Sequence, residues 1–141
     1  MSKSNRRNKS IKIKNVQPNV SIDRDVLSQD DYPTFCFKYL SSVSIRDCKS
    51  PDFFVEFLLR LKKLSELGWK EIRQSRKHSF GMEKIPVEKI RPQLPVCVTP
   101  DVKHLHVLRA TGSNLPFVGV EMQKVFRVLF IETAFGDIYE H

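Results

Sequence analysis

The sequence lacks every short motif that would by itself identify a cofactor-dependent enzyme. Its 141 residues contain no glycine-rich phosphate loop, no H-E-x-x-H, no G-x-S-x-G and no acid-rich calcium loop. No apolar run approaches the roughly 18 to 20 residues that a membrane-spanning helix requires, and the basic N-terminus carries no apolar segment typical of a secretory signal. We therefore expect a cytoplasmic protein without a cofactor.

Cysteine is scarce, and potential metal ligands are scattered. The chain has three cysteines, an odd number, at Cys36, Cys48 and Cys97, and no C-x-x-C spacing occurs. This favours reduced thiols over a disulfide framework or a thiolate zinc site. His104 and His106 would lie on one face of a strand, as half of a metal site, but no third ligand has suitable spacing. The alternative is an exposed or hydrogen-bonded pair, and we predict no metal.

The positive charge is unevenly distributed along the chain. Residues 1–14 hold six bases and no acid, and thus supply six of the eight net positive charges. Residues 60–77 hold seven bases against two acids, so the other residues of the 15–141 stretch carry a net charge of −3. A basic patch of this kind can attract a polyanion, although a lysine-rich helix face is often simply solvated.

Composition predicts one folded domain behind a disordered arm. Residues 1–20 are rich in Ser, Asn, Lys and Arg and lack periodic apolar positions, so they cannot bury enough surface to offset the entropy of ordering. The acidic stretch 21–31 is expected to form a short helix or a docking loop. Hydrophobic residues make up 40% of the chain, which is ample for one core in a domain spanning 21–141.

Two helices are predicted in the middle of the chain. Ser50, Pro51 and Asp52 place a capping hydroxyl, a first-turn proline and an acid where a helix begins. Six apolar residues then recur at helical spacing and are expected to face the core: Phe53, Phe54, Phe57, Leu58, Leu61 and Leu64. Gly68 is expected to end this helix, and a shorter one is predicted from Trp69 to about Arg76. Trp69 and the Phe cluster are expected in the core rather than as base-stacking platforms.

Strands are predicted on both sides of these helices. An aromatic and β-branched stretch predicts a strand near 35–43, and alternation or continuous apolar runs predict further strands in HVLRATG, LPFVGV, VFRVLFIE and DIYEH. Residues 78–84 are expected to form a loop, whereas prolines disfavour a central strand over 85–95. Residues 96–98 could form a short edge strand. The predicted class is therefore α+β, with a small antiparallel sheet packed against a helix pair in β-α-α-β-β-β order.

Several scattered residues could carry metal-independent RNA cleavage, which needs a proton acceptor, a cation for the phosphate and a proton donor. Arg109, at the end of a predicted strand, could hold phosphate, or could form a salt bridge. Tyr139 and His141 could transfer protons, although chain ends are often frayed. His78 and Glu83 could place a base beside cations, or belong to a polar loop. The candidate RNA-binding cations are Lys63, Lys70, Arg73, Arg76 and Lys77.

The charged residue inside the last long strand is expected to be structural. Arg127 lies within the apolar stretch VFRVLFI, and a buried charge there requires a partner. Glu121 or Glu132 could supply that partner.

The order FCFKYLSSVSI, PDFFVEFLLRLKKL, WKEIRQSRK, LHVLRATG, LPFVGV, VFRVLFIE and DIYEH resembles the RelE/YoeB-like toxin ribonucleases of the RelE/ParE superfamily over roughly residues 34–141. In that family a strand arginine and basic residues with a C-terminal Tyr or His act on messenger RNA in the ribosome. The resemblance implies these roles for Arg109, Tyr139 and His141, and implies a protein antitoxin as partner. The competing hypothesis is a non-enzymatic α+β module that binds nucleic acid or an acidic protein.

Overall fold

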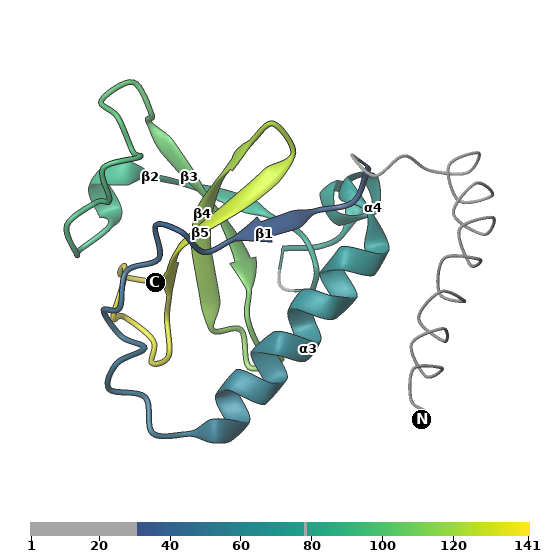
Figure 1. Ribbon diagram of the computed structural model, residues 1–141, viewed down its shortest axis with the longest axis horizontal. Coiled ribbons are helices and arrows are strands. Elements are labelled where there is room, and N and C mark those ends of the chain that lie inside the picture. The colour runs from purple at the N-terminus through teal and green to yellow at the C-terminus, as the bar shows by residue number, and fades with distance from the viewer. Residues whose placement is uncertain (1–30, 78) are drawn as a thin grey trace, which may run out of the picture. The chain divides into compact units, whose positions relative to one another are not determined.

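The computed structural model describes residues 31–77 and 79–141. The predicted arm, nearly all of the acidic stretch and His78 lie outside the described residues. The compact unit Tyr32–His141 contains these elements (Figure 1): β1 (Thr34–Cys36), α3 (Pro51–Leu67), α4 (Trp69–Gln74), β2 (Glu83–Pro86), a short 3-10 helix (Val87–Lys89), β3 (His104–Arg109), β4 (Pro116–Met122) and β5 (Val125–Ile131). The predicted α+β class is confirmed.

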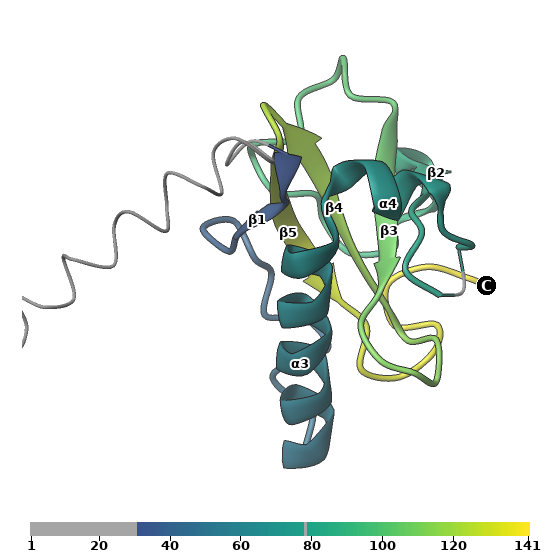
Figure 2. The same cartoon turned by 90° about the vertical axis from the view of Figure 1, so that its right-hand side faces the viewer.

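The five strands form one mixed sheet in the order β1-β5-β4-β3-β2. Strands β2 to β5 pair antiparallel as a continuous meander. Strand β1 adds to the open edge of β5 in parallel, with Phe35 opposite Phe126. A strand that pairs in parallel requires a crossover connection. Here the chain between β1 and β2 contains both helices. Figure 2 shows α3 and α4 on one face of the sheet.

The predicted start and end of α3 are confirmed. The Ser50 hydroxyl accepts a hydrogen bond from the backbone N–H of Phe53, Pro51 is the first helical residue, and Gly68 follows with a φ of 86°. A glycine adopts this left-handed conformation without a steric penalty. Helix α4 begins directly afterwards and is two residues shorter than predicted.

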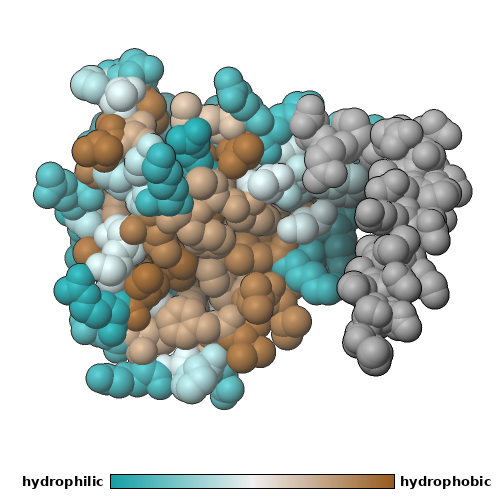
Figure 3. Space-filling view, in the orientation of Figure 1, coloured by the Kyte–Doolittle hydropathy of each residue, from teal (hydrophilic) through white to brown (hydrophobic). Residues whose placement is uncertain are grey.

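The buried face of α3 is narrower than predicted. Phe53, Phe57, Leu61 and Leu64 pack with sheet residues such as Phe117 and Phe126. Phe54 and Leu58, which were expected in the core, are 38% and 65% exposed, because they lie about 100° around the helix from Phe53 and Phe57. With Val55 and Leu59 they leave an exposed apolar side of α3, and Figure 3 shows apolar residues over the part of this face where α3 lies.

Three strand predictions are corrected. The strand expected near 35–43 ends at Cys36, because the chain turns with a hydrogen bond from the N–H of Leu40 to the carbonyl of Phe37. Residues 96–98 form a turn, closed by a bond from Val98 to Pro95. The expected terminal strand is a single bridge between Ile90 and Tyr139. Residues 83–84, expected in a loop, instead begin strand β2. Residues 85–86, where a central strand was not expected, complete β2 at the edge of the sheet.

A second core cluster forms around other sheet residues. Its members include Leu105, Val107, Val118 and Ile138, with partly buried residues of the 87–102 segment packed against them. Leu108 and Ala110 belong to the helix-side cluster, so alternation along β3 directs Arg109 to the opposite side. Within the described residues, no helix is long and apolar enough to cross a membrane.

Candidate functional site

Arg109 lies at the end of β3, and each nitrogen of its guanidinium donates a hydrogen bond. Its side chain is 4% exposed and forms an ion pair through Nη2 with Oε2 of Glu83 on β2. Its Nε donates to the carbonyl oxygen of Lys77 at 3.4 Å, and its Nη1 donates to that of Asn114 at 3.3 Å. A buried guanidinium needs such partners, and each of its three nitrogens already has a protein acceptor. Arg109 thus joins β2, the loop after α4 and the β3–β4 turn.

Tyr139 lies beside this pair. Its side chain is buried at 6% exposure, and burial raises the pKa of its hydroxyl, while the positive charge of Arg109 opposes the rise. The negative charges of Glu83 and Glu132 also raise this pKa. Tyr139 therefore lies within electrostatic range of both carboxylates, and a buried neutral phenol is its favoured form.

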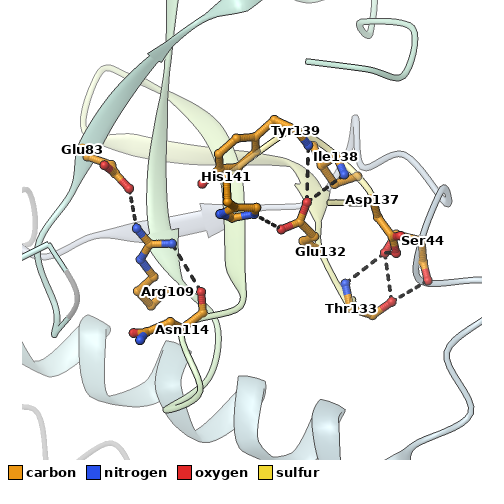
Figure 4. Close-up of polar contacts among 10 residues, drawn as sticks. All are labelled: Ser44, Glu83, Arg109, Asn114, Glu132, Thr133, Asp137, Ile138, Tyr139 and His141. Carbon is orange, nitrogen blue, oxygen red and sulfur yellow. Dashed lines mark hydrogen bonds and ion pairs between the residues drawn. The ribbon is translucent and has the colours of Figure 1, made fainter. Parts of the chain in front are cut away.

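His141 completes a cluster of polar side chains that also contains Glu83, Arg109 and Tyr139. Its ring centroid lies 4.3 Å from that of Tyr139, and its Nε2 lies 2.5 Å from Oε1 of Glu132. The His141 side chain is 29% exposed, whereas Glu132 is fully buried. Figure 4 shows the imidazole between the Arg109–Glu83 pair and Glu132. The C-terminal histidine is thus held at a defined position with part of its ring open to solvent.

Glu132 holds the chain end through its other oxygen. Its Oε2 accepts hydrogen bonds from the backbone N–H groups of Ile138 at 2.8 Å and Tyr139 at 3.3 Å. The sequence had suggested Glu132 only as a partner for Arg127. The signal for its actual role is an acid that directly follows the apolar stretch of β5 and lies six residues before an apolar pair.

Of the predicted RNA-binding cations, Lys77 lies at this cluster. Its Nζ is 3.6 Å from Oε1 of Glu83, and its side chain is 56% exposed. Lys63, Lys70 and Arg73 are exposed on α3 and α4, and Arg76 is exposed just after α4. The cluster therefore has a cation at its solvent side, whereas its arginine is buried.

The loop that carries Lys77 closes tightly on Gly81. The Gly81 N–H donates to the carbonyl oxygen of Arg76 at 2.8 Å, and a Cβ at position 81 would lie 2.3 Å from the carbonyl oxygen of Ser75. No real side chain tolerates that contact with backbone, so only glycine fits without displacement of the loop.

We expect Gly81→Ala to lower the free energy of unfolding by about 1 to 3 kcal/mol, the usual cost of overpacking. Urea unfolding followed through Trp69, the single tryptophan, which is 2% exposed, measures the change. Gly112→Ala is the matched control, because a Cβ there meets only Oε2 of Glu56 at 3.4 Å. Equal stability of the two variants would contradict the prediction.

The His104 and His106 pair does not form a metal centre with neighbouring residues. Across residues 31–77 and 79–141, no group of three His, Cys, Asp or Glu side chains is placed to hold a metal ion. Burial lowers the pKa of His106, the charge of Glu121 opposes this shift, and the charges of Lys84 and His104 add to it. Its Nδ1 is buried and has no hydrogen-bond partner among the described residues.

This lowered pKa predicts a pH dependence of stability. The unfolded chain binds a proton at His106 more readily than the folded chain, so stability is lost as pH falls below the unfolded pKa of about 6.5. We expect His106→Gln to lose less stability than the wild type between about pH 7.5 and pH 5. Urea unfolding at both pH values measures the difference, and His104→Gln, an exposed neighbour, is the control. If His106→Gln and the wild type lose the same stability over this pH range, the prediction is contradicted.

Arg127 has no carboxylate partner in the described part of the chain. Its guanidinium lies over the ring of Tyr39, 5.8 Å from the centroid, and its buried Nε has no hydrogen-bond partner there. The expected pairing with Glu132 is wrong, because that carboxylate binds His141 and the chain end. A cation over an aromatic face is the interaction that remains for Arg127.

A cavity beside the turn after β5 contains none of the predicted site residues. It has a volume of about 470 Å³ and is lined by Ser44, Asp47, Cys48, Lys49, Ser50, Thr133, Ala134 and Asp137. The cluster around Arg109, Tyr139 and His141 is thus separate from this cavity.

The comparisons with known proteins add no relative to this picture. No family model matches the sequence, and no match is found among curated proteins or among solved structures.

Proposed function

We propose that the protein is a RelE-like endoribonuclease that cleaves RNA by metal-independent transesterification. The observation that supports this proposal is the convergence of Glu83, Arg109, Tyr139 and His141, which come from β2, β3 and the chain end. All four were candidates for catalysis from sequence alone. A structural ion pair requires two of these residues, whereas proton transfer at a phosphate requires acids, bases and cations together.

Glu83 suits the role of general base. A carboxylate accepts protons and hydrogen bonds only, and Arg109 fixes one of its oxygens while the other faces Lys77. In the first step Glu83 takes the proton of a 2′-hydroxyl, whose oxygen attacks the adjacent phosphorus. Arg109 acts by positioning Glu83, because its guanidinium is buried and each of its nitrogens bonds to the protein itself. This differs from the phosphate contact expected from sequence.

His141 suits the role of general acid. The carboxylate of Glu132 orients the imidazole, as an acid does for a catalytic histidine in other enzymes. When the bond from phosphorus to the 5′-oxygen breaks, His141 gives that oxygen its proton. The products are a 2′,3′-cyclic phosphate and a free 5′-hydroxyl. Lys77 and Arg76 hold the phosphate oxygens, and Tyr139 supports the ring of His141.

The resemblance to toxin ribonucleases extends this proposal. It suggests ribosome-bound messenger RNA as substrate, an antitoxin as protein partner, and the cytoplasm as location. His78, outside the described residues, stays a candidate for a further proton transfer.

The test is cleavage of RNA by the purified protein. Free RNA and ribosome-bound message are incubated with the protein and a metal chelator, and the product ends are identified by mass. We expect cyclic phosphate and 5′-hydroxyl ends, and no cleavage at a nucleotide that carries 2′-deoxyribose. If both RNAs stay intact while Arg109→Ala keeps all cellular effects of the wild type, the proposal is refuted.

Burial of Arg109 favours one second candidate, a non-enzymatic module. In that case the Arg109–Glu83 pair is structural, and the exposed cations of α4 bind nucleic acid or an acidic protein. Neutralising Lys70, Arg73 and Lys77 would then abolish binding, whereas His141→Gln would have no effect on any measured function. The two candidates therefore predict opposite results for His141→Gln, which abolishes function only if the protein is a ribonuclease.

A further inference from the structure

The turn after β5 presents one aromatic ring to solvent beside His141. Phe135 is 57% exposed, so more than half of its surface is open to solvent. Its ring centroid lies 5.1 Å from that of His141, with the planes at 89°. Within the described residues, this is the only ring contact of Phe135. The ring is thus placed at the candidate site without being part of either core cluster.

The turn holds this position without using the Phe135 side chain. The hydroxyl of Ser44 donates to Oδ2 of Asp137 at 2.8 Å and accepts from the backbone N–H of Thr133 at 2.9 Å. The Thr133 hydroxyl donates to the carbonyl oxygen of Ser44 at 2.8 Å, and Figure 4 shows this network to the right of Glu132. The N–H of Asp137 donates to the carbonyl of Ala134 at 3.2 Å. The backbone on both sides of Phe135 is therefore anchored independently of its ring.

We propose that Phe135 is a stacking platform for an unpaired base of an RNA strand bound at His141. Single-stranded RNA is recognised largely by bases that stack on exposed aromatic side chains. A base on Phe135 would bring its neighbouring phosphate to the imidazole 5.1 Å away, with the cations of the Lys77 loop further along the cluster. A stacked base must be unpaired, so the platform selects single-stranded over double-stranded RNA. The inference rests on the proposed function, because it takes His141 as the reacting group.

The experiment measures binding without cleavage. A short RNA that contains 2-aminopurine and carries 2′-O-methyl groups cannot undergo transesterification, and stacking quenches its fluorescence. Phe135→Ala is expected to weaken its affinity about 5- to 150-fold, the usual effect of losing one base–aromatic stack, and to remove the quenching. Phe135→Trp is expected to keep the wild-type affinity and the quenching. Phe135→Leu is expected to lose both, as Phe135→Ala does. Double-stranded RNA should bind more weakly and should not respond to these changes.

Phe37→Ala is the matched control, because Phe37 is also an exposed phenylalanine, at 41%, and should leave affinity unchanged. Unfolding temperatures of all variants confirm that they fold. The platform is overturned if the wild type binds no single-stranded RNA, if Phe135→Ala binds like the wild type, or if Phe135→Leu retains full affinity. Failure of the proposed function is distinct: a protein that cleaves no RNA but needs Phe135 for binding keeps the platform and loses the ribonuclease.

Discussion

Replacement of His141 by glutamine is expected to lower the rate of RNA cleavage about 10²- to 10⁴-fold, the usual contribution of one positioned acid or base. Glutamine can donate a hydrogen bond to Oε1 of Glu132 in place of the imidazole, but it cannot release a proton to a leaving oxygen. Single-turnover cleavage with excess protein measures this step directly. The affinity for uncleavable RNA should change little.

Two variants control for the position and the residue type. Glu140→Gln changes the exposed residue next to His141, and His104→Gln removes another exposed imidazole. Both should cleave RNA at the wild-type rate. A His141→Gln protein as fast as these controls would exclude His141 as the acid and would favour the non-enzymatic module.

Replacement of Glu132 by alanine is expected to lower the free energy of unfolding by about 3 to 5 kcal/mol. Glu132 is completely buried, with 0% of its surface exposed. Loss of its carboxylate leaves the N–H groups of Ile138 and Tyr139 without their acceptor. Each buried unsatisfied group costs about 1 to 3 kcal/mol. The loss is a large share of the total stability of a domain, which is about 5 to 15 kcal/mol. Urea unfolding followed through Trp69 measures it.

Glu132→Gln separates the structural from the chemical role of this carboxylate. Its amide oxygen can still accept both N–H groups, so we expect most of the stability to be retained, while the negative charge opposite His141 is lost. Cleavage should therefore fall although the protein is folded. Glu88→Ala, at an exposed position, controls for loss of an acid. If Glu132→Ala is as stable as Glu88→Ala, the chain end does not depend on Glu132.

Local signals in the sequence were sufficient for the helices and the central strands. The hydroxyl of Ser50, the ring of Pro51 and the backbone freedom of Gly68 act within a few residues, so α3 could be bounded without knowledge of the fold. The apolar runs of β4 and β5 likewise indicate buried strands. The burial of the α3 side chains was harder to predict, because the apolar residues occupy more of the helix surface than the sheet can cover. Phe54 and Leu58 therefore remain outside the core.

The ends of the chain and the sheet edges depended on distant partners. The segment after Cys36 leaves the sheet, and the N–H of Ser41 instead donates to Leu129, 88 positions away. The terminal residues do not extend a strand, because Glu132 accepts the N–H groups of Ile138 and Tyr139. The residues beside Ser41 carry no signal for its bond, and the chain end has only the weak one of an acid six residues before an apolar pair.

The sequence alone determined the residue types that suit metal-independent proton transfer, the α+β class and the order of the main elements, because these follow from composition, periodicity and capping. Tertiary structure decided which candidates meet. It buried Arg109 against Glu83, placed Tyr139 between that pair and His141, and fixed His141 on Glu132. The physical reason is that an ion pair or a hydrogen bond depends on distance in space, and these partners are separated along the chain by strands whose register only the folded sheet sets.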